Sequence, residues 1–178
     1  MRVLKKIFLV LLILIVLAVG GSFLLPRTYH VERSVATRAK PDALYVYVGD
    51  LKRWEEWTAW NKEMDPTMER AYQGSEKGAG AKMTWKGNQV GKGSVLITKG
   101  EPAKGITYDL EFEDGKYRSG GELRFEPVGS DTRVVWTNDG DAGWNPMTRV
   151  FNLFMDRLIG PDFQKGLDKL KTLAEARA

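Results

Sequence analysis

The C-terminal stretch WNPMTRVFNLFMDRLIGPDFQKGLDKLKTLAEA, residues 144–176, has the apolar spacing of a long amphipathic helix. Asn145 is a suitable N-cap, and Pro146 suits the first helical position. Apolar side chains then recur at helical spacing, first at Met147, Val150, Phe151, Phe154, Met155, Leu158 and Ile159, and later at Phe163, Leu167, Leu170 and Ala174. Gly160 and Pro161 predict a kink there, or a division into two helices. Such a helix needs an apolar surface to cover.

A sheet with one apolar face supplies that surface. Six short strands are predicted between turn sequences rich in Gly, Pro, Asn and Asp, at residues 68–73, 81–86, 93–99, 106–113, 121–127 and 132–138. Within residues 106–113, Ile106, Tyr108, Leu110 and Phe112 alternate with polar side chains. Short connections favour an antiparallel meander, and such a sheet is able to bury one face and expose the other.

Two kinds of element are expected before these strands. Residues 27–36, RTYHVERSVA, alternate in the manner of a strand with one largely apolar face. Pro41 then suits the start of a short amphipathic helix that ends near Gly49 and Asp50. A second short helix is expected to carry the sequence WEEWTAW, residues 54–60.

The N-terminus has the strongest single signal. Residues 7–25 include no ionisable side chain, and as a helix they would extend about 28 Å, one bilayer core. A cleaved signal peptide is the alternative, with residues 7–17 as its apolar region and Ala18 and Gly20 near the cleavage point. We favour a retained anchor because the apolar sequence SFLLP continues beyond that point. The predicted division is an anchor at residues 1–26 and a domain at residues 27–178.

The charges beside this segment indicate its orientation. Arg2, Lys5 and Lys6 favour a cytoplasmic N-terminus, although Arg27 and Arg33 follow on the other side. We therefore expect a single-pass protein of the cytoplasmic (inner) membrane with its domain on the extracytoplasmic side.

Composition excludes several classes of site. The chain has no cysteine, so disulfides and thiolate chemistry are excluded, and it has one histidine, His30. The net charge of +4 comes from scattered residues, which does not predict a nucleic-acid partner. NDGDAG, residues 138–143, lacks the spacing of a calcium loop and is interpreted as a turn, and GNQVGKG, residues 87–93, as a hairpin. No cofactor, metal site or catalytic residue is predicted.

Three segments indicate a known family: DLKRWEEWTAWNKEMDPTM (residues 50–68), VGKGSVLIT (90–98) and GWNPMTRVFNLFMDRLIGPDFQKGLDKLK (143–171). The chain resembles the START-like helix-grip superfamily, also called SRPBCC, and within it a polyketide cyclase/dehydrase-like bacterial branch. The resemblance covers residues 28–174. It implies an α+β fold in which a seven-stranded curved antiparallel sheet wraps a long C-terminal helix, with two short helices after the first strand.

The residues expected to line a cavity come from the sheet and the helix facing it. They are Met83, Trp85, Val95, Ile97, Tyr108, Leu110, Phe112, Leu123 and Phe125 on the sheet, and Val150, Phe151, Phe154, Met155 and Leu158 on the helix. Trp57 and Trp60 share a helical face with Trp54 and are interpreted either as core or as a gate at the cavity mouth. The polar atoms expected inside are the Tyr108 hydroxyl and the indole N–H groups.

Three hypotheses follow from this arrangement. The first is a membrane-tethered module that binds a lipid or another hydrophobic small molecule. The second is an enzyme of cyclase or dehydratase type, which rests on the family resemblance alone. The third is a protein-interaction module of the envelope in which the sheet and helix leave no cavity.

Overall fold

The computed structural model describes residues 2–177 and contains one seven-stranded sheet with the order β1-β7-β6-β5-β4-β3-β2. Its strands are β1 (Thr28–Thr37), β2 (Glu69–Gly74), β3 (Ala81–Gly87), β4 (Gly91–Glu101), β5 (Gly105–Phe112), β6 (Tyr117–Val128) and β7 (Asp131–Asp141). Every neighbouring pair is antiparallel. The predicted meander is confirmed, and only β1 leaves it by pairing with β7.

The strand register explains why one face of the sheet is apolar. Ile97 lies opposite Tyr108, which lies opposite Gly121, and Leu123 lies opposite Trp136. These residues therefore share one face, and the side chains of all but Gly121 are fully buried there. The alternate positions carry charged residues such as Glu122 and Arg124 on the outer face. The alternation seen in the sequence thus predicted which face is buried.

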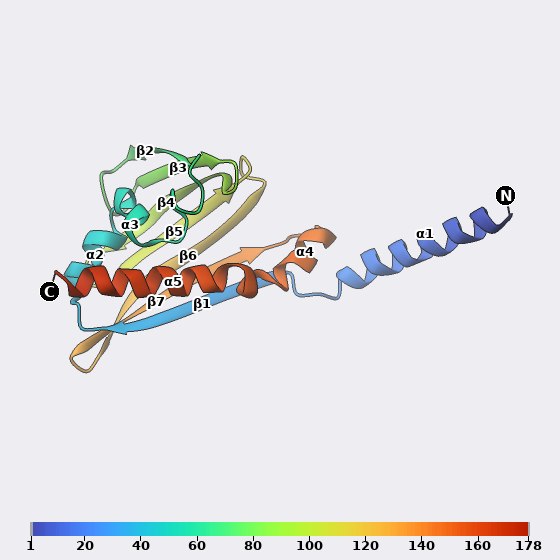
Figure 1. Cartoon of the computed structure of the whole chain (residues 1–178). Coiled ribbons are helices and arrows are strands. Elements are labelled where there is room, and N and C mark those ends of the chain that lie inside the picture. The colour runs from blue at the N-terminus through green and yellow to red at the C-terminus, as the bar shows by residue number, and fades with distance from the viewer. Residues whose placement is uncertain (1, 178) are drawn as a thin grey trace.

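Five helical segments complete the domain. They are α2 (Pro41–Val48), the 3₁₀ turn η1 (Leu51–Arg53), α3 (Trp54–Trp57), α4 (Pro146–Asn152) and α5 (Met155–Glu175). The α5 helix lies along β1 and also packs against α2 and α3 (Figure 1). Phe163, Leu167 and Leu170 of α5 are buried in the core. The α+β helix-grip fold expected from the sequence is confirmed.

The C-terminal segment is divided at a different place from the one expected. The break lies at Leu153 and Phe154, where the backbone N–H groups bond to carbonyls three residues back. Pro161 instead lies inside the continuous α5 helix. Its missing N–H leaves the Arg157 carbonyl without a helical partner, and because Arg157 is exposed, water can take that place. Gly160 leaves room for the Arg33 guanidinium, which would have to move if a Cβ atom were present there.

The strands β4, β6 and β7 are longer than expected, and the length of β7 changes the interpretation of residues 138–143. The β7 strand continues to Asp141, and β6 begins at Tyr117. Residues 139–141 therefore continue the strand in place of the expected turn, and Asn138, the last residue of the predicted strand, is buried. Its side-chain oxygen accepts a hydrogen bond from the Tyr29 hydroxyl at 2.7 Å, an acceptor that the turn-like composition concealed.

The N-terminal helix α1 (Arg2–Ser22) projects away from the domain, from the same end at which α4 lies (Figure 1). Residues Leu4–Ser22 are long and apolar enough to cross a membrane, and none of the most apolar part is buried against the domain. A signal sequence satisfies the same criteria, so both alternatives from the sequence stand.

Candidate ligand-binding cavity

A cavity of about 270 Å³ lies between the inner sheet face, the segment that follows α3, and α5. Its wall is largely apolar and aromatic, and it is made by Trp54, Thr58, Trp60, Met64, Met68, Arg70, Met83, Trp85, Gln89, Val90, Val95, Tyr108, Leu110, Phe112, Trp136 and Phe163. Met83 and Val95 face each other on β3 and β4, and Val95 faces Leu110 on β5, so the sheet register itself assembles the floor.

One side of the cavity is a cluster of packed aromatic rings. The Trp136 ring stacks on Phe163 of α5 with a centroid distance of 4.0 Å, and Trp60 meets both rings edge-on. Trp57 also packs against Trp136, with a distance of 5.1 Å between the ring centroids. Offset and edge-to-face contacts of this kind stabilise a cluster beyond simple burial. The rings therefore form a rigid wall that joins α3, β7 and α5.

The polar atoms of this cluster are mostly satisfied within the protein. The indole N–H of Trp54 donates to the Val48 carbonyl, and that of Trp57 donates to the Tyr47 carbonyl. Trp136 donates to the Tyr108 hydroxyl at 2.9 Å. Among residues 2–177, Trp60 and Trp85 are the cavity-lining tryptophans whose indole N–H is not engaged in this way.

Tyr108 is held as a structural residue. Its hydroxyl accepts the bond from Trp136 and donates to the Thr137 carbonyl at 2.9 Å. Burial raises the pKa of Tyr108 well above its ordinary value, because the phenolate would be charged in an apolar interior. The group is neutral and already bonded on both sides. It is therefore poorly suited to polarise a carbonyl in the cavity.

The Trp85 ring forms the opposite wall. It meets Phe112 edge-on at 5.3 Å and lies directly over Gly93 of β4. A Cβ atom at position 93 would meet the Trp85 ring at 2.5 Å, closer than real Cβ contacts. Gly93 thus lets this large ring lie flat against the sheet beside the cavity.

Asp65 fixes the segment that closes the cavity. The residue is fully buried, and its carboxylate accepts bonds from the Thr67 hydroxyl and from the backbone N–H groups of Gln89 and Val90. The Thr67 hydroxyl bond and the backbone bonds lower the pKa of Asp65 to about 2. This residue ties the loop carrying Met64 to the β3–β4 hairpin, and both lie at the cavity wall.

In the part of the chain that the structure describes, Arg70 is the one cationic residue that lines the cavity. Its side chain is 7% exposed and pairs with Glu55 at 2.7 Å, while a second nitrogen donates to the Trp60 carbonyl at 2.7 Å. Its Nε is buried without a hydrogen-bond partner among residues 2–177. A buried donor without a partner is unfavourable, so a polar group of a guest or a water molecule would stabilise this position.

The structure places the predicted residues of the sheet and of the WEEWTAW segment in two groups. Seven of the predicted residues line the cavity: Trp60, Met83, Trp85, Val95, Tyr108, Leu110 and Phe112. The others, Trp57, Ile97, Leu123 and Phe125, are buried in the core outside the cavity wall. Of the two interpretations of WEEWTAW, Trp54 and Trp57 fit the core, since both are buried, whereas Trp60 is partly exposed at the cavity.

The predicted helix residues lie elsewhere, and this corrects the expectation that they face the sheet. Phe151, Phe154 and Leu158 are 59%, 48% and 52% exposed, Val150 is also exposed, and Met155 packs at the edge of the core. With Met147, three of these form what we call the exposed stripe: Met147, Phe151, Phe154 and Leu158. The buried residues of α5 are Phe163, Leu167, Leu170 and Ala174. At about 100° per residue the two sets are roughly 160° apart on a continuous helix, so both cannot face the sheet.

Several lining residues were not predicted. Met64, Met68, Gln89 and Val90 lie in turns or at strand ends, where no periodic pattern marks a buried side. Trp136 was detectable, because it lies two residues after Val134, on the same face of the strand predicted at residues 132–138. Phe163 was assigned to the helix core without being placed at the cavity.

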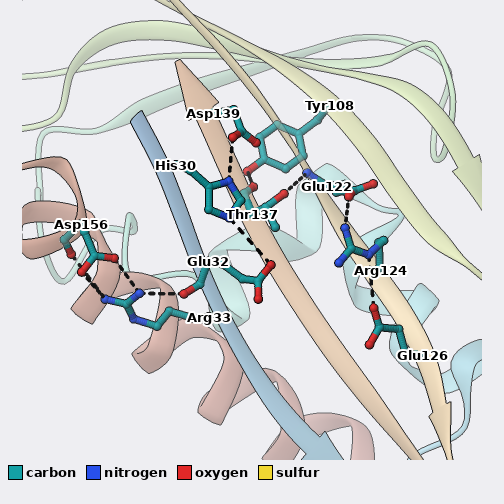
Figure 2. A network of polar contacts seen from close by, with 10 residues as sticks. All are labelled: His30, Glu32, Arg33, Tyr108, Glu122, Arg124, Glu126, Thr137, Asp139 and Asp156. Carbon is teal, nitrogen blue, oxygen red and sulfur yellow. Dashed lines mark hydrogen bonds and ion pairs between the residues drawn. The ribbon is translucent and has the colours of Figure 1, made fainter. Parts of the chain in front are cut away.

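Figure 2 shows polar contacts from both faces of the sheet. On the outer face, His30 is exposed and lies 2.7 Å from Asp139. Arg33 is the register partner of the inward-facing Trp136, and it pairs with Asp156 of α5 at 2.7 Å. A larger open hollow of about 810 Å³ crosses the ends of β1, β7, β6 and β5. Exposed charged groups line much of it, so it does not exclude water from a guest. The enclosed apolar cavity is the better candidate site.

Comparison with known proteins agrees with this architecture. Residues 28–175 match the family model described as "Polyketide cyclase / dehydrase and lipid transport". The chain belongs to this family. The resemblance to the START-like helix-grip superfamily is thereby confirmed, and it supports hydrophobic small-molecule binding at the level of the family. No curated protein matches the chain.

Solved structures share the fold at low identity. A protein of unknown function from Staphylococcus aureus has a TM-score of 0.59 at 11% identity, with 84% of this chain and 96% of that one covered. A protein from Thermus thermophilus has a TM-score of 0.56 at 18% identity, with 84% and 99% covered. The di-domain ARO/CYC StfQ from the steffimycin biosynthetic pathway has a TM-score of 0.62 at 13% identity, with 84% of this chain and 51% of that one covered.

Proposed function

We propose that this protein is a membrane-tethered helix-grip module that binds a hydrophobic small molecule or one chain of a lipid. Residues 1–26 would be the anchor and residues 27–178 the binding domain, on the extracytoplasmic side of the cytoplasmic membrane. The observation that carries the proposal is the partly enclosed apolar cavity of about 270 Å³ between the inner sheet face, the segment after α3, and Phe163 of α5. It lies just below the roughly 300–1,000 Å³ typical of ligand pockets.

The size of the cavity restricts the guest. Its volume is that of about nine water molecules in the liquid, so it would enclose a compact apolar molecule or a single short chain. A complete two-chain lipid would leave most of its surface outside.

The polar groups in the wall suggest an amphipathic guest. The indole N–H groups of Trp60 and Trp85 and the buried Nε of Arg70 are donors, and an oxygen acceptor on the guest would satisfy them. Within residues 2–177, the side chains that line the wall include no carboxylate or histidine, and the Tyr108 hydroxyl is already engaged. These features support binding over acid–base catalysis.

Native mass spectrometry of the full chain, extracted from membranes in mild detergent, tests the proposal. We expect a bound apolar molecule in the unmodified chain and a loss of at least tenfold in occupancy in Val90→Trp, because the larger ring would fill the cavity mouth. Val128→Trp is the matched control, since Val128 also lies beside a hairpin turn but is exposed on the far hairpin. Absence of any adduct, together with no uptake of a fluorescent fatty acid, would overturn the proposal.

A further inference from the structure

The exposed stripe continues an apolar surface that begins in α1. Trp144, in the turn just before α4, is 79% exposed, which is unusual for so large a ring. Leu24, just beyond the end of α1, is 89% exposed. Exposed apolar residues are ordinary when scattered, but an aligned set on adjoining segments marks an interaction surface.

The end of α1 is bonded to α4, so the two surfaces keep a fixed relation. The guanidinium of Arg149 is buried and donates to the Phe23 carbonyl at 2.9 Å and to the Leu25 carbonyl at 3.4 Å. It also lies over the Phe23 ring, which in turn contacts Trp144. Asn152 donates to the Arg27 carbonyl at 2.9 Å. Arg149 thus takes the place of a C-cap for α1 while holding α4 beside it.

We infer that Trp144 and the exposed stripe lie in the interface of the same bilayer that α1 spans. The inference rests on the proposed membrane tether. An anchor that crosses the hydrocarbon core must leave it near Ser22 to Leu25, and the bonds of Arg149 hold α4 at that level. Trp is the side chain that favours this depth, and an amphipathic helix that lies in the interface buries its apolar side there. The domain would then be held against the membrane with one orientation.

Single-cysteine spin labels on the full chain test this arrangement, because the chain has no cysteine of its own. The variants Phe151→Cys and Phe154→Cys are compared with Leu14→Cys in α1 and Val128→Cys on the far hairpin. Each is labelled with a nitroxide in vesicles of phosphatidylethanolamine and phosphatidylglycerol. The ratio of collisions with oxygen to collisions with a water-soluble nickel chelate reports depth. All four positions are exposed, so the labels should not disturb folding.

We expect the Leu14 label to be the deepest, the Phe151 and Phe154 labels to be shielded from the nickel chelate at least several-fold, and the Val128 label to be fully accessible. Phe151 and Phe154 labels as accessible as the Val128 label, with Leu14 still deep, would overturn this inference and leave the tether intact. A Leu14 label exposed to water would overturn the tether as well. Strong dipolar broadening at Phe151 would assign the surface to a second copy of the chain and also overturn the inference.

Discussion

Phe163→Ala should both lower the stability of the domain and enlarge the cavity, because Phe163 packs in the core and lines the cavity wall. Phe163 is 2% exposed, stacks on Trp136 at 4.0 Å and meets Trp60 at 5.7 Å. Truncating a buried phenylalanine costs about 3–5 kcal/mol. We place this site toward the upper end because two ring contacts are lost together. For a domain of this size the loss corresponds to a fall in Tm of roughly 6–20 °C.

The same substitution should also change the length of guest molecule that the cavity prefers. Phe163 is the one residue of α5 in the cavity wall, so removing its ring joins the vacated space to the existing 270 Å³. Leu167→Ala is the matched control, because Leu167 is fully buried one turn later on α5 but does not line the cavity. It should cost about 2–5 kcal/mol without changing the preferred guest length.

Chemical denaturation followed by circular dichroism gives the stability of each full-length variant in detergent. Competition with fatty acids of increasing length gives the preferred guest. A decrease of less than about 1 kcal/mol in the free energy of unfolding of Phe163→Ala would mean that the ring is not packed tightly against Trp136 and Trp60. The same preferred length in Phe163→Ala and Leu167→Ala would refute its place in the cavity wall. Phe163→Leu, a smaller truncation, keeps the test available if the alanine variant does not fold.

Two further predictions concern the tryptophan segment and the buried carboxylate. Trp57→Ala should cost about 3–5 kcal/mol in denaturation with little change in affinity for the guest, because the ring is core. Trp60→Ala should weaken fatty-acid binding up to roughly tenfold, and it should lower stability less than Trp57→Ala does, because Trp60 is only partly buried. Equal effects of the two variants on stability and on binding would contradict this distinction. The pKa of Asp65 is lowered from 3.8 to about 2, so its contribution to stability is present above pH 3.8 and is lost as pH falls toward 2. The stability gap between the unmodified chain and Asp65→Asn should therefore narrow across that window, and a gap that is constant with pH would exclude the role of the Asp65 charge.

The sheet was predictable because alternation reports burial directly. Ile106 and Tyr108 face the same side whatever the length of the strand, so an error at the strand ends leaves the buried face correct. The ends themselves were less predictable. Gly120 looks like a turn residue and falls outside the predicted strand, yet it lies within β6 beside Gly121, which allows the Tyr108 hydroxyl to come close.

The terminal helix shows the limit of periodicity. Helical spacing identifies an apolar side but does not say what covers it, whether a sheet or a bilayer. The angular positions of these residues around the helix axis are more informative than their regular spacing. Leu158 and Phe163 are five residues apart, so their side chains cannot lie on one side of a helix. The polar cavity residues were beyond prediction for another reason. Arg70 and Gln89 reach the cavity through β2 and a hairpin, and their position depends on long-range pairing.

The division of the terminal segment also bears on how the domain selects its guest. Since Phe163 is the one contact from α5, the rest of the cavity wall comes from the sheet and from the segment held by Asp65 and Arg70. The exposed stripe contributes nothing to that wall. On the proposed function, guest selectivity and membrane contact would therefore depend on separate sets of side chains, and α5 carries one member of each, Phe163 and Leu158. Because the two sets are separate, a substitution in one can be tested without disturbing the other.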